Sequence, residues 1–432
     1  MPDRPRRRGA LVATTALGLA LASATSRAGG FAIFEHGARG MGFAGAFTAQ
    51  SSDPSAIFHN AAGIAFLKGR QIYLGGAVIA PKSDFTGADP FPGKGIKEKD
   101  DVGFLVPPAA YYTHQFSERT VLGVGVNAPF GLKSRWADPD TFTGRFVSVM
   151  ADLKAFSINP AVAYKLADRL AVGAGVDVRL STVIFERRVP LVNPFTQRVV
   201  DVATARLKSD TSTGVGFNVG LLAKPTESLA IGLSYRHKVN LEYTGSGVFR
   251  RISTGNAQVD SLVAARLPSG AVPFKTAVEF PAIASAGVAY TWGDWTFEAD
   301  VNWYQWSTFD RVILRFETRP ELNQVLEEQY EDVFQYRAGA ERRLTDAWTV
   351  RGGYFFDKSP SPAASVSPIL PDADRHGVAL GATWRRGRLR VDVANWLLFF
   401  KERSTEGESR DRYDGTYKSF AETLGVSVGY SF

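Results

Sequence analysis

The sequence predicts an all-β protein, a transmembrane antiparallel β-barrel of about 14 strands with a small N-terminal plug inside its lumen. Three observations predict this class. Segments in which apolar residues alternate with polar or small ones recur along the chain, short and long connections alternate between them, and aromatic residues cluster near segment ends. Alternation with a period of two is typical of strands that have one apolar face.

The last segment shows the alternation most clearly. From Leu424 to Phe432, every even-numbered residue is apolar and every odd-numbered residue is glycine or serine. We expect fourteen strands of this kind, at residues 70–82, 102–116, 119–130, 154–167, 170–186, 211–224, 229–243, 276–291, 294–307, 332–344, 347–357, 376–386, 388–401 and 419–432.

The lengths of the connections indicate a membrane barrel. Short connections, such as 117–118 and 168–169, alternate with long ones, such as 83–101 and 131–153. A soluble sandwich has no reason to sort its loops by end, whereas outer-membrane barrels combine short periplasmic turns with long outer loops. The aromatic clusters resemble the two interfacial girdles of such barrels, for example around Trp292, Trp306 and Trp396. A secreted sandwich or another soluble β-protein that binds hydrophobic ligands is the alternative.

Composition excludes several classes of chemistry. The 432 residues include no cysteine, which excludes disulfides, thiolate metal sites and thiol nucleophiles. The five histidines include no pair four residues apart, and none lies in a recognisable nucleophile context. We therefore expect no enzyme activity, no metal and no cofactor. No basic stretch interleaved with aromatic residues suggests a nucleic-acid partner.

The N-terminus is predicted to be a cleaved signal peptide covering residues 1–28. A basic stretch at residues 6–8 precedes a run of small and apolar residues, and Ser26 and Ala28 provide small residues at the −3 and −1 positions. Residues 22–24 form a competing cleavage site. Cleavage after Ala28 removes five basic residues and one acidic residue, which leaves a nearly balanced charge.

Residues 29–69 differ from the rest because they are rich in small residues and mostly do not alternate. We expect them to form the plug and residues 70–432 to form the barrel. About 8 strands close around a lumen that side chains can fill, but 16–18 strands leave an aqueous channel. A 14-strand lumen is therefore wide enough to need such a filling.

Within this segment, Asp53-Pro54-Ser55-Ala56-Ile57-Phe58-His59-Asn60-Ala61-Ala62-Gly63 resembles the plug of the FadL/TodX outer-membrane channels for long-chain fatty acids and aromatic hydrocarbons. That family carries Asn-Pro-Ala-Gly here, whereas this chain has Ala61 in place of the proline. Residues 127–131, 338–346 and 370–375 extend the resemblance over residues 29–432. The resemblance implies 14 strands, an N-terminal hatch and an inward kink in the third strand, through which ligand leaves sideways. Its hatch motif corresponds to Asp53, Asn60, Ala61, Ala62 and Gly63.

The third predicted strand contains candidate residues for such a kink. Pro129 has no N–H for the strand ladder, so it belongs at a strand end, an edge or a bulge. It could simply end the strand. Alternatively, it could loosen the strand together with Gly123, Gly125 and Gly131.

A pathway for hydrophobic molecules needs apolar surface with few polar groups. Basic headgroup partners could be Lys133 or Arg145. Ordinary packing is the alternative for the apolar ligand-binding candidates, which are Phe31, Ile33 and Phe34 near the N-terminus, and Leu132, Trp136, Phe142 and Phe146 in the connection after the third strand.

These features predict a channel in the outer membrane of a Gram-negative cell for passive uptake of hydrophobic molecules, with long-chain fatty acids as the expected cargo. Uptake of aromatic hydrocarbons, or a general porin or adhesin-like barrel, are the alternatives. We expect a monomer surrounded by membrane lipid and lipopolysaccharide. The terminal Phe432 would be read by the outer-membrane insertion machinery during assembly.

Overall fold

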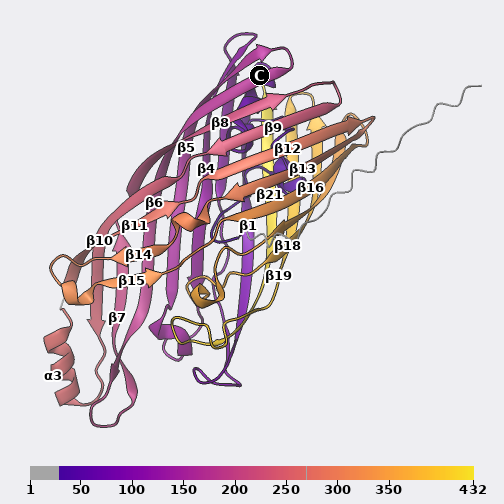
Figure 1. The fold of residues 1–432 in the computed structure, drawn as a ribbon. Helices are drawn as coiled ribbons and strands as arrows, with labels where there is room; N and C mark the ends of the chain where they lie inside the picture. Colours follow the sequence, from indigo (N-terminus) through magenta and orange to yellow (C-terminus); the bar gives the residue numbers. More distant parts are fainter. Residues whose placement is uncertain (1–28, 269) are drawn as a thin grey trace, which may run out of the picture.

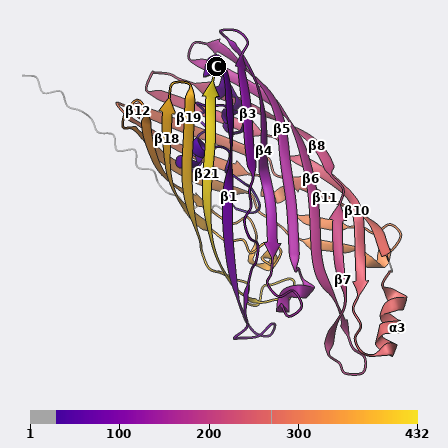
Figure 2. The same ribbon diagram turned by 180° about the vertical axis from the view of Figure 1, so that it is seen from behind.

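Fourteen strands form a closed antiparallel barrel in the computed structural model, which describes residues 29–268 and 270–432 (Figures 1 and 2). The predicted fold class is confirmed. The predicted signal peptide lies outside the described residues. The barrel strands are β1 (Arg70–Gly87), β3 (Pro108–Gln115), β4 (Thr120–Arg135), β5 (Met150–Ala167), β6 (Leu170–Val192), β8 (Ser212–Ala223), β9 (Leu229–Arg236), β12 (Ile283–Trp292), β13 (Trp295–Tyr304), β16 (Val333–Arg343), β17 (Trp348–Asp357), β18 (Arg375–Arg386), β19 (Leu389–Phe400) and β21 (Gly415–Ser431).

Each barrel strand pairs with its neighbours along the chain, and β21 closes the barrel on β1. The closing pair runs from Gln71 opposite Ser431 to Gly87 opposite Gly415. Large apolar side chains on the outer face are exposed, as at Leu424 and Val426, whereas charged side chains such as Asp177 are buried inside. Such an arrangement, lipid-facing outside and polar inside, is that of an outer-membrane barrel.

Short turns and the C-terminus lie at one end of the barrel, and the long connections lie at the other (Figure 1). At that outer end, β10 (Val239–Arg251) and β11 (Gly270–Phe280) pair with each other beyond β9 and β12. The remaining elements there are β2 (Lys97–Lys99), β7 (Val199–Ser209), β14 (Arg311–Leu314), β15 (Gln324–Glu327), β20 (Arg403–Ser404), α3 (Ala257–Arg266), η2 (Thr143–Phe146), η3 (Trp306–Thr308), η4 (Pro320–Leu322) and η5 (Ala363–Ser365).

Of the three tryptophans named above for the girdles, one lies on the lipid-facing surface and two do not. Trp292 is 69% exposed beside a short turn, as expected for a girdle residue. Trp306 and Trp396 are fully buried, so their assignment to the girdle was wrong. Trp396 shares the inward face of β19 with Asp392, and Trp306 belongs to η3, beyond the end of β13.

The plug, by which we mean residues 29–69, fills the lumen with short elements: α1 (Ala38–Gly42), α2 (Ala56–His59) and η1 (Ala61–Phe66). Among the described residues, no helix is long and apolar enough to span a membrane. The backbone of the plug comes so close to the wall that a Cβ at Gly339 would lie 2.7 Å from the carbonyl oxygen of Phe43. Inward-facing glycines of the wall therefore make room for the plug.

Strand β4 is irregular where β3 is missing beside it. The pairing of β3 with β4 ends at Val126, and the register of β4 on β5 shifts between Asn127 and Phe130. There the plug takes the place of a wall strand: Ile33 N–H donates to Pro129 O, and Gly131 N–H donates to Phe31 O, both at 3.0 Å. The wall is thus completed by a segment of the plug.

Candidate hydrophobic pathway

Three cavities lie along the barrel wall near this irregularity. We call them the outer cavity, of about 300 Å³, the inner cavity, of about 170 Å³, and the wall pocket, of about 130 Å³. The outer cavity includes Phe146, Val183, Phe274 and Phe309 in its lining, the inner cavity Phe34, Phe355, Trp396 and Phe400, and the wall pocket Leu105, Ala128, Ala155 and Phe156.

Neighbouring cavities share lining residues. Phe31 lies between the outer and inner cavities, and Ile33 lies between the inner cavity and the wall pocket. Leu132 lines all three. Only a few shared side chains therefore separate each cavity from the next.

The ring of Phe31 is held in an aromatic cluster. Its centroid lies 4.7 Å from that of Trp306 and 5.2 Å from that of Phe309, both at steep interplanar angles. Phe280 and Phe130 follow at 6.0 and 6.2 Å. Edge-to-face contacts of this kind stabilise a specific geometry. A molecule that passes from the outer to the inner cavity must therefore disturb this cluster.

Most of the ligand-binding residues predicted from the sequence line these cavities. Phe31, Ile33, Phe34, Leu132 and Trp136 line the inner cavity, and Phe146 lines the outer one. Phe142 lines none of the three. It stacks on the indole of Trp136, with ring centroids 4.8 Å apart and nearly parallel planes. Whether these residues bind ligand stays a prediction.

Sequence reasoning missed the far side of the inner cavity. Phe355 on β17 and Trp396 and Leu398 on β19 face Phe34 there. The indole Nε1–H of Trp396 donates to the carbonyl oxygen of Met41 in the plug, at 2.5 Å. Alternation could have shown that these residues share an inward face, but no local signal connects them to a plug residue more than 300 positions away.

Asn60 of the hatch motif is bonded only to backbone groups. Its Oδ1 accepts from Ala62 N–H, which caps η1, and its Nδ2 donates to Thr48 O in the plug and Leu221 O in β8. Ala61 and Ala62 pack tightly against Gly173 in the wall, and Gly63 packs against Ser51. These contacts fix the plug to itself and to the wall.

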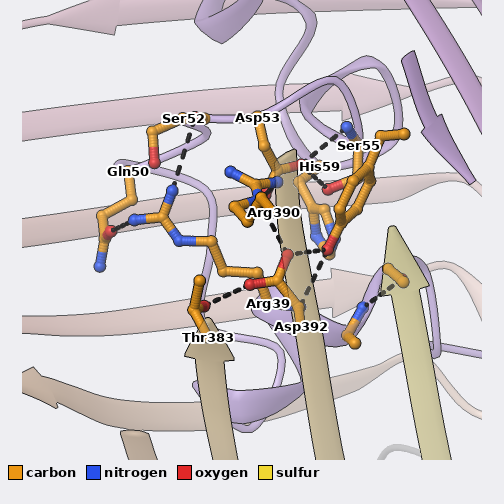
Figure 3. Close-up of polar contacts among 12 residues, drawn as sticks. Arg39, Gln50, Ser52, Asp53, Ser55, His59, Thr383, Arg390 and Asp392 are labelled. Atoms are coloured by element: carbon orange, nitrogen blue, oxygen red, sulfur yellow. Dashed lines mark hydrogen bonds and ion pairs between the residues drawn. The ribbon is translucent and has the colours of Figure 1, made fainter. Parts of the chain in front are cut away.

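Asp53, the other polar residue of the hatch motif, lies in a buried charge cluster that joins the plug to β19 (Figure 3). Its Oδ1 accepts from the N–H and Oγ–H of Ser55, and its Oδ2 lies 3.4 Å from Nη2 of Arg390. Nε of Arg390 lies 2.9 Å from Asp392, which also accepts from the hydroxyls of Tyr73 and Thr383. Arg390 therefore links a plug carboxylate to a wall carboxylate.

Two carboxylates of β13 hold the plug in another way, by accepting hydrogen bonds from its backbone. Asp300 Oδ2 accepts from the N–H groups of Phe47 and Thr48, at 2.8 and 2.9 Å. Glu298 Oε1 accepts from Ala49 N–H at 2.6 Å. Buried carboxylates need such donors because burial in a low-dielectric interior disfavours their charge.

The predicted kink residues lie on both sides of the register shift. Pro129 and Gly131 form the backbone bonds to the plug described above. Gly123 and Gly125 lie in regular pairing on both edges of β4. The missing Cβ atoms there leave room for Ile57 of the plug and Tyr111 of β3. A role in ligand exit stays a prediction for all four residues.

The two basic candidates for a headgroup partner differ in their surroundings. The Arg145 guanidinium makes three hydrogen bonds of 2.9–3.1 Å to Asp201, so its donors are largely occupied. Lys133 lines both the inner cavity and the wall pocket.

In the outer cavity, burial and the nearby Asp411 raise the pKa of Glu328 to about 8.

Comparisons with known proteins agree with this architecture. A family model described as outer membrane protein transport protein (OMPP1/FadL/TodX) matches residues 19–432. A long-chain fatty acid transport protein of Escherichia coli O6:H1 is 23% identical, over 96% of this chain and 97% of that protein. Two solved structures share the fold. A Pseudomonas aeruginosa FadL homologue has a TM-score of 0.82 at 22% identity, covering 94% of this chain and 100% of that one. The Ralstonia pickettii toluene transporter TbuX has a TM-score of 0.70 at 17% identity, covering 92% and 99%.

Proposed function

Because the chain belongs to the OMPP1/FadL/TodX family of outer-membrane transport proteins, we propose that it takes up hydrophobic molecules passively and releases them sideways into the membrane through the wall pocket. Outer-membrane location and transport of hydrophobic compounds are properties of the family. The lateral step and the choice of cargo are the parts proposed here.

The observation that carries the proposal is the series of three cavities with shared lining. Leu132 borders all of them, and the plug blocks the straight route through the lumen. The last cavity lies at the only side of β4 where a plug segment, rather than a strand, completes the described wall. Cargo that reaches the inner cavity therefore borders the wall pocket, which shares Ile33, Leu132 and Lys133 with that cavity.

The physical chemistry of the cargo favours the lateral exit. A hydrophobic molecule gains roughly 0.8 kcal/mol for each CH₂ group that it buries in lipid rather than in water. An exit into the bilayer is thus strongly downhill for a long acyl chain, and an exit into the periplasm is not. No energy source is required, provided that metabolism consumes the cargo inside the cell.

Long-chain fatty acids are the cargo we propose. Relatives over nearly the full length carry the name long-chain fatty acid transport protein. Aromatic hydrocarbons are the second candidate, because the structural neighbours include toluene transporters. Both kinds of molecule need an apolar path, and uptake of labelled oleate against labelled toluene in a host that lacks its own channel distinguishes them.

Filling the wall pocket tests the lateral route. Ala128 is buried in the lining of this pocket, away from the outer cavity. An indole from Ala128→Trp would occupy the space, so we expect oleate uptake to fall by more than tenfold. Binding at the outer cavity and the heat-modifiable folded band on gels should remain.

The matched control is Ala299→Trp. Ala299 is exposed on the outer face of β13, far from the pocket along the wall. The Ala299→Trp substitution adds the same side chain to the lipid-facing surface and should leave uptake unchanged. Full uptake by a folded Ala128→Trp protein would overturn the lateral route and indicate a path through the plug.

A further inference from the structure

One lysine at the wall pocket lacks a counter-ion. Three charged side chains line this pocket: Lys133 on β4, and Asp152 and Lys154 on β5. Asp152 pairs with Lys154, with Nζ and Oδ2 3.4 Å apart. Within the described part of the chain, Lys133 makes no ion pair and no side-chain hydrogen bond. Asp152 also lies opposite Lys133 across the β4–β5 pair, but its printed ion-pair distance is to Lys154, so the lining carries one more positive charge than negative charges.

This ammonium lies at the outer edge of the lipid-facing band. Along the outer face of β5, Phe156 and Ile158 are exposed apolar residues, and the next outward residue toward the outer end is Lys154. Lys133 lies opposite Asp152 across the β4–β5 pair, two residues further toward the outer end than Lys154. Charged groups of lipids and fatty acids are stable at this interface, because it is where the hydrocarbon meets water.

We propose that Lys133 binds the carboxylate of an ionised fatty acid at the wall pocket while the acyl chain passes into the membrane. This inference rests on the proposed function and names its substrate class. A carboxyl group with an ordinary pKa near 4 is ionised at neutral pH. The ammonium provides three donors for it, and the alkyl stem of the lysine can lie along the apolar lining. A neutral hydrocarbon gains nothing from this group.

The other two cavities are less favourable binding sites for the carboxylate of a ligand. The inner cavity includes the basic residues Lys82, Lys133 and Arg375 in its lining, but Glu35, Asp100 and Asp372 balance them. Nε of Arg375 also lies 3.1 Å from Asp357. In the outer cavity, Arg187 is accompanied by Glu328 and Asp411. Like charges nearby disfavour a further carboxylate. The wall pocket is the one of the three cavities whose lining has more basic than acidic side chains.

The test compares laurate with 1-dodecanol, which has the same chain length and no charge. Lys133→Gln removes the charge, Lys133→Arg keeps it, and Lys154→Gln removes the paired neighbour. Initial uptake is measured at pH 7.5 in a host without its own channel. We expect Lys133→Gln to lower laurate uptake about threefold to tenfold, the range of a partly exposed charge-assisted hydrogen bond. Dodecanol uptake should not change, and Lys133→Arg should restore laurate uptake.

Each other outcome overturns the inference. An equal loss for both compounds means that Lys133 only packs in the wall. No loss for either compound means that Lys133 does not bind the transported molecule. The lysine could then bind only the phosphate of a membrane lipid. If the unaltered protein takes up toluene but no laurate, the inference and the proposed fatty-acid cargo are both wrong, whereas uptake of hydrophobic molecules by the lateral route stands. If Ala128→Trp leaves all uptake intact, the proposed lateral route itself is wrong.

Discussion

Single charged residues inside the barrel are buried in groups that neutralise one another. Asp177 lies 2.8 Å from both Arg179 and Arg236, and all three side chains are at most 5% exposed. Removing one partner of such a buried pair commonly costs about 3–5 kcal/mol, because it leaves a charge without compensation. The lumen of this barrel is therefore a packed interior in which charges have specific partners.

The two histidines of the plug, buried His36 and half-buried His59, are neutral groups. Burial lowers the pKa of His36 well below its usual value and that of His59 to about 4. The arginines Arg236 and Arg337 nearby act in the same direction, whereas Asp53 raises the pKa of His59. In the unfolded plug a histidine has a pKa near 6.5. The unfolded form then binds more protons below pH 6.5, so acid destabilises the folded plug.

We expect His59→Gln to reduce this acid sensitivity. The stability that depends on neutral His59 is complete above pH 6.5 and is lost as the pH falls toward 4, at most about 3 kcal/mol. Hydrogen exchange of the plug amides, corrected for the intrinsic effect of pH, should accelerate less in the variant between pH 7 and 4.5.

The neighbouring Glu35 provides the internal control. Burial raises the pKa of its carboxyl, so its protonation favours the folded plug at low pH, opposite to His59. Glu35→Gln should therefore increase the acid sensitivity that His59→Gln decreases. Identical exchange profiles for His59→Gln and the unaltered protein would contradict the assignment.

At the scale of elements, β4 depends on a plug segment for part of its pairing. Ala32 and Phe130 lie opposite each other, flanked by the two backbone bonds of 3.0 Å. They are a non-hydrogen-bonded pair, and in such pairs the Cα atoms are about 4.5 Å apart. That distance falls within the range of disulfides. Since Ile33 separates the inner cavity from the wall pocket, this segment must move before cargo can pass.

A disulfide between Ala32→Cys and Phe130→Cys should therefore stop uptake in the oxidised protein. The chain contains no native cysteine, so no other disulfide can form. Reduction should restore oleate uptake, and the reduced form of the same protein controls for the loss of the Phe130 ring. Equal uptake before and after reduction, with the disulfide verified by mass spectrometry, would mean that cargo passes without movement of this segment.

At the scale of the whole molecule, the barrel does not need the plug to complete most of its strand ladder. Strand pairs from β1 around to β21 complete the wall, and the plug adds backbone bonds to it beside Phe130 and at the start of β1. The wall charges that face the plug would meet water in an open lumen rather than lipid. Loss of the plug should therefore mainly increase the permeability of the barrel, with little effect on its folding.

Deletion of residues 29–60 should leave a folded but leaky barrel. We expect a heat-modifiable band on gels, together with increased sensitivity of cells to large antibiotics that the outer membrane normally excludes. Asp53→Asn in the full chain should cause less leakage than the deletion, because it weakens one plug contact and leaves the lumen filled. A deletion variant that excludes antibiotics as well as the full-length protein does would show that the segment is no plug.

Much of this architecture was predictable from the sequence by itself. Alternation located the strands, the sorted connections indicated the outer end, and the small-residue segment after residue 28 set a small N-terminal region apart from the strands. Boundaries near β4 were less accurate: the second strand begins at Pro108 rather than at residue 102, and β4 continues to Arg135. Strands near the register shift of β4 end where a partner strand is missing, and the local sequence does not show where a partner strand lies.

Only the tertiary structure shows the cavities on which the proposed pathway rests. A period of two shows which residues share a face, but it does not show that Trp396 faces Met41 or that Gly30 N–H donates to Asp372, 342 positions away. Arg145 and Lys133 look equivalent in the sequence, and only the structure gives one of them a carboxylate partner. The reason is that cavities and ion pairs arise where distant segments meet, whereas the hydrophobic pattern that specifies a strand is contained within the strand.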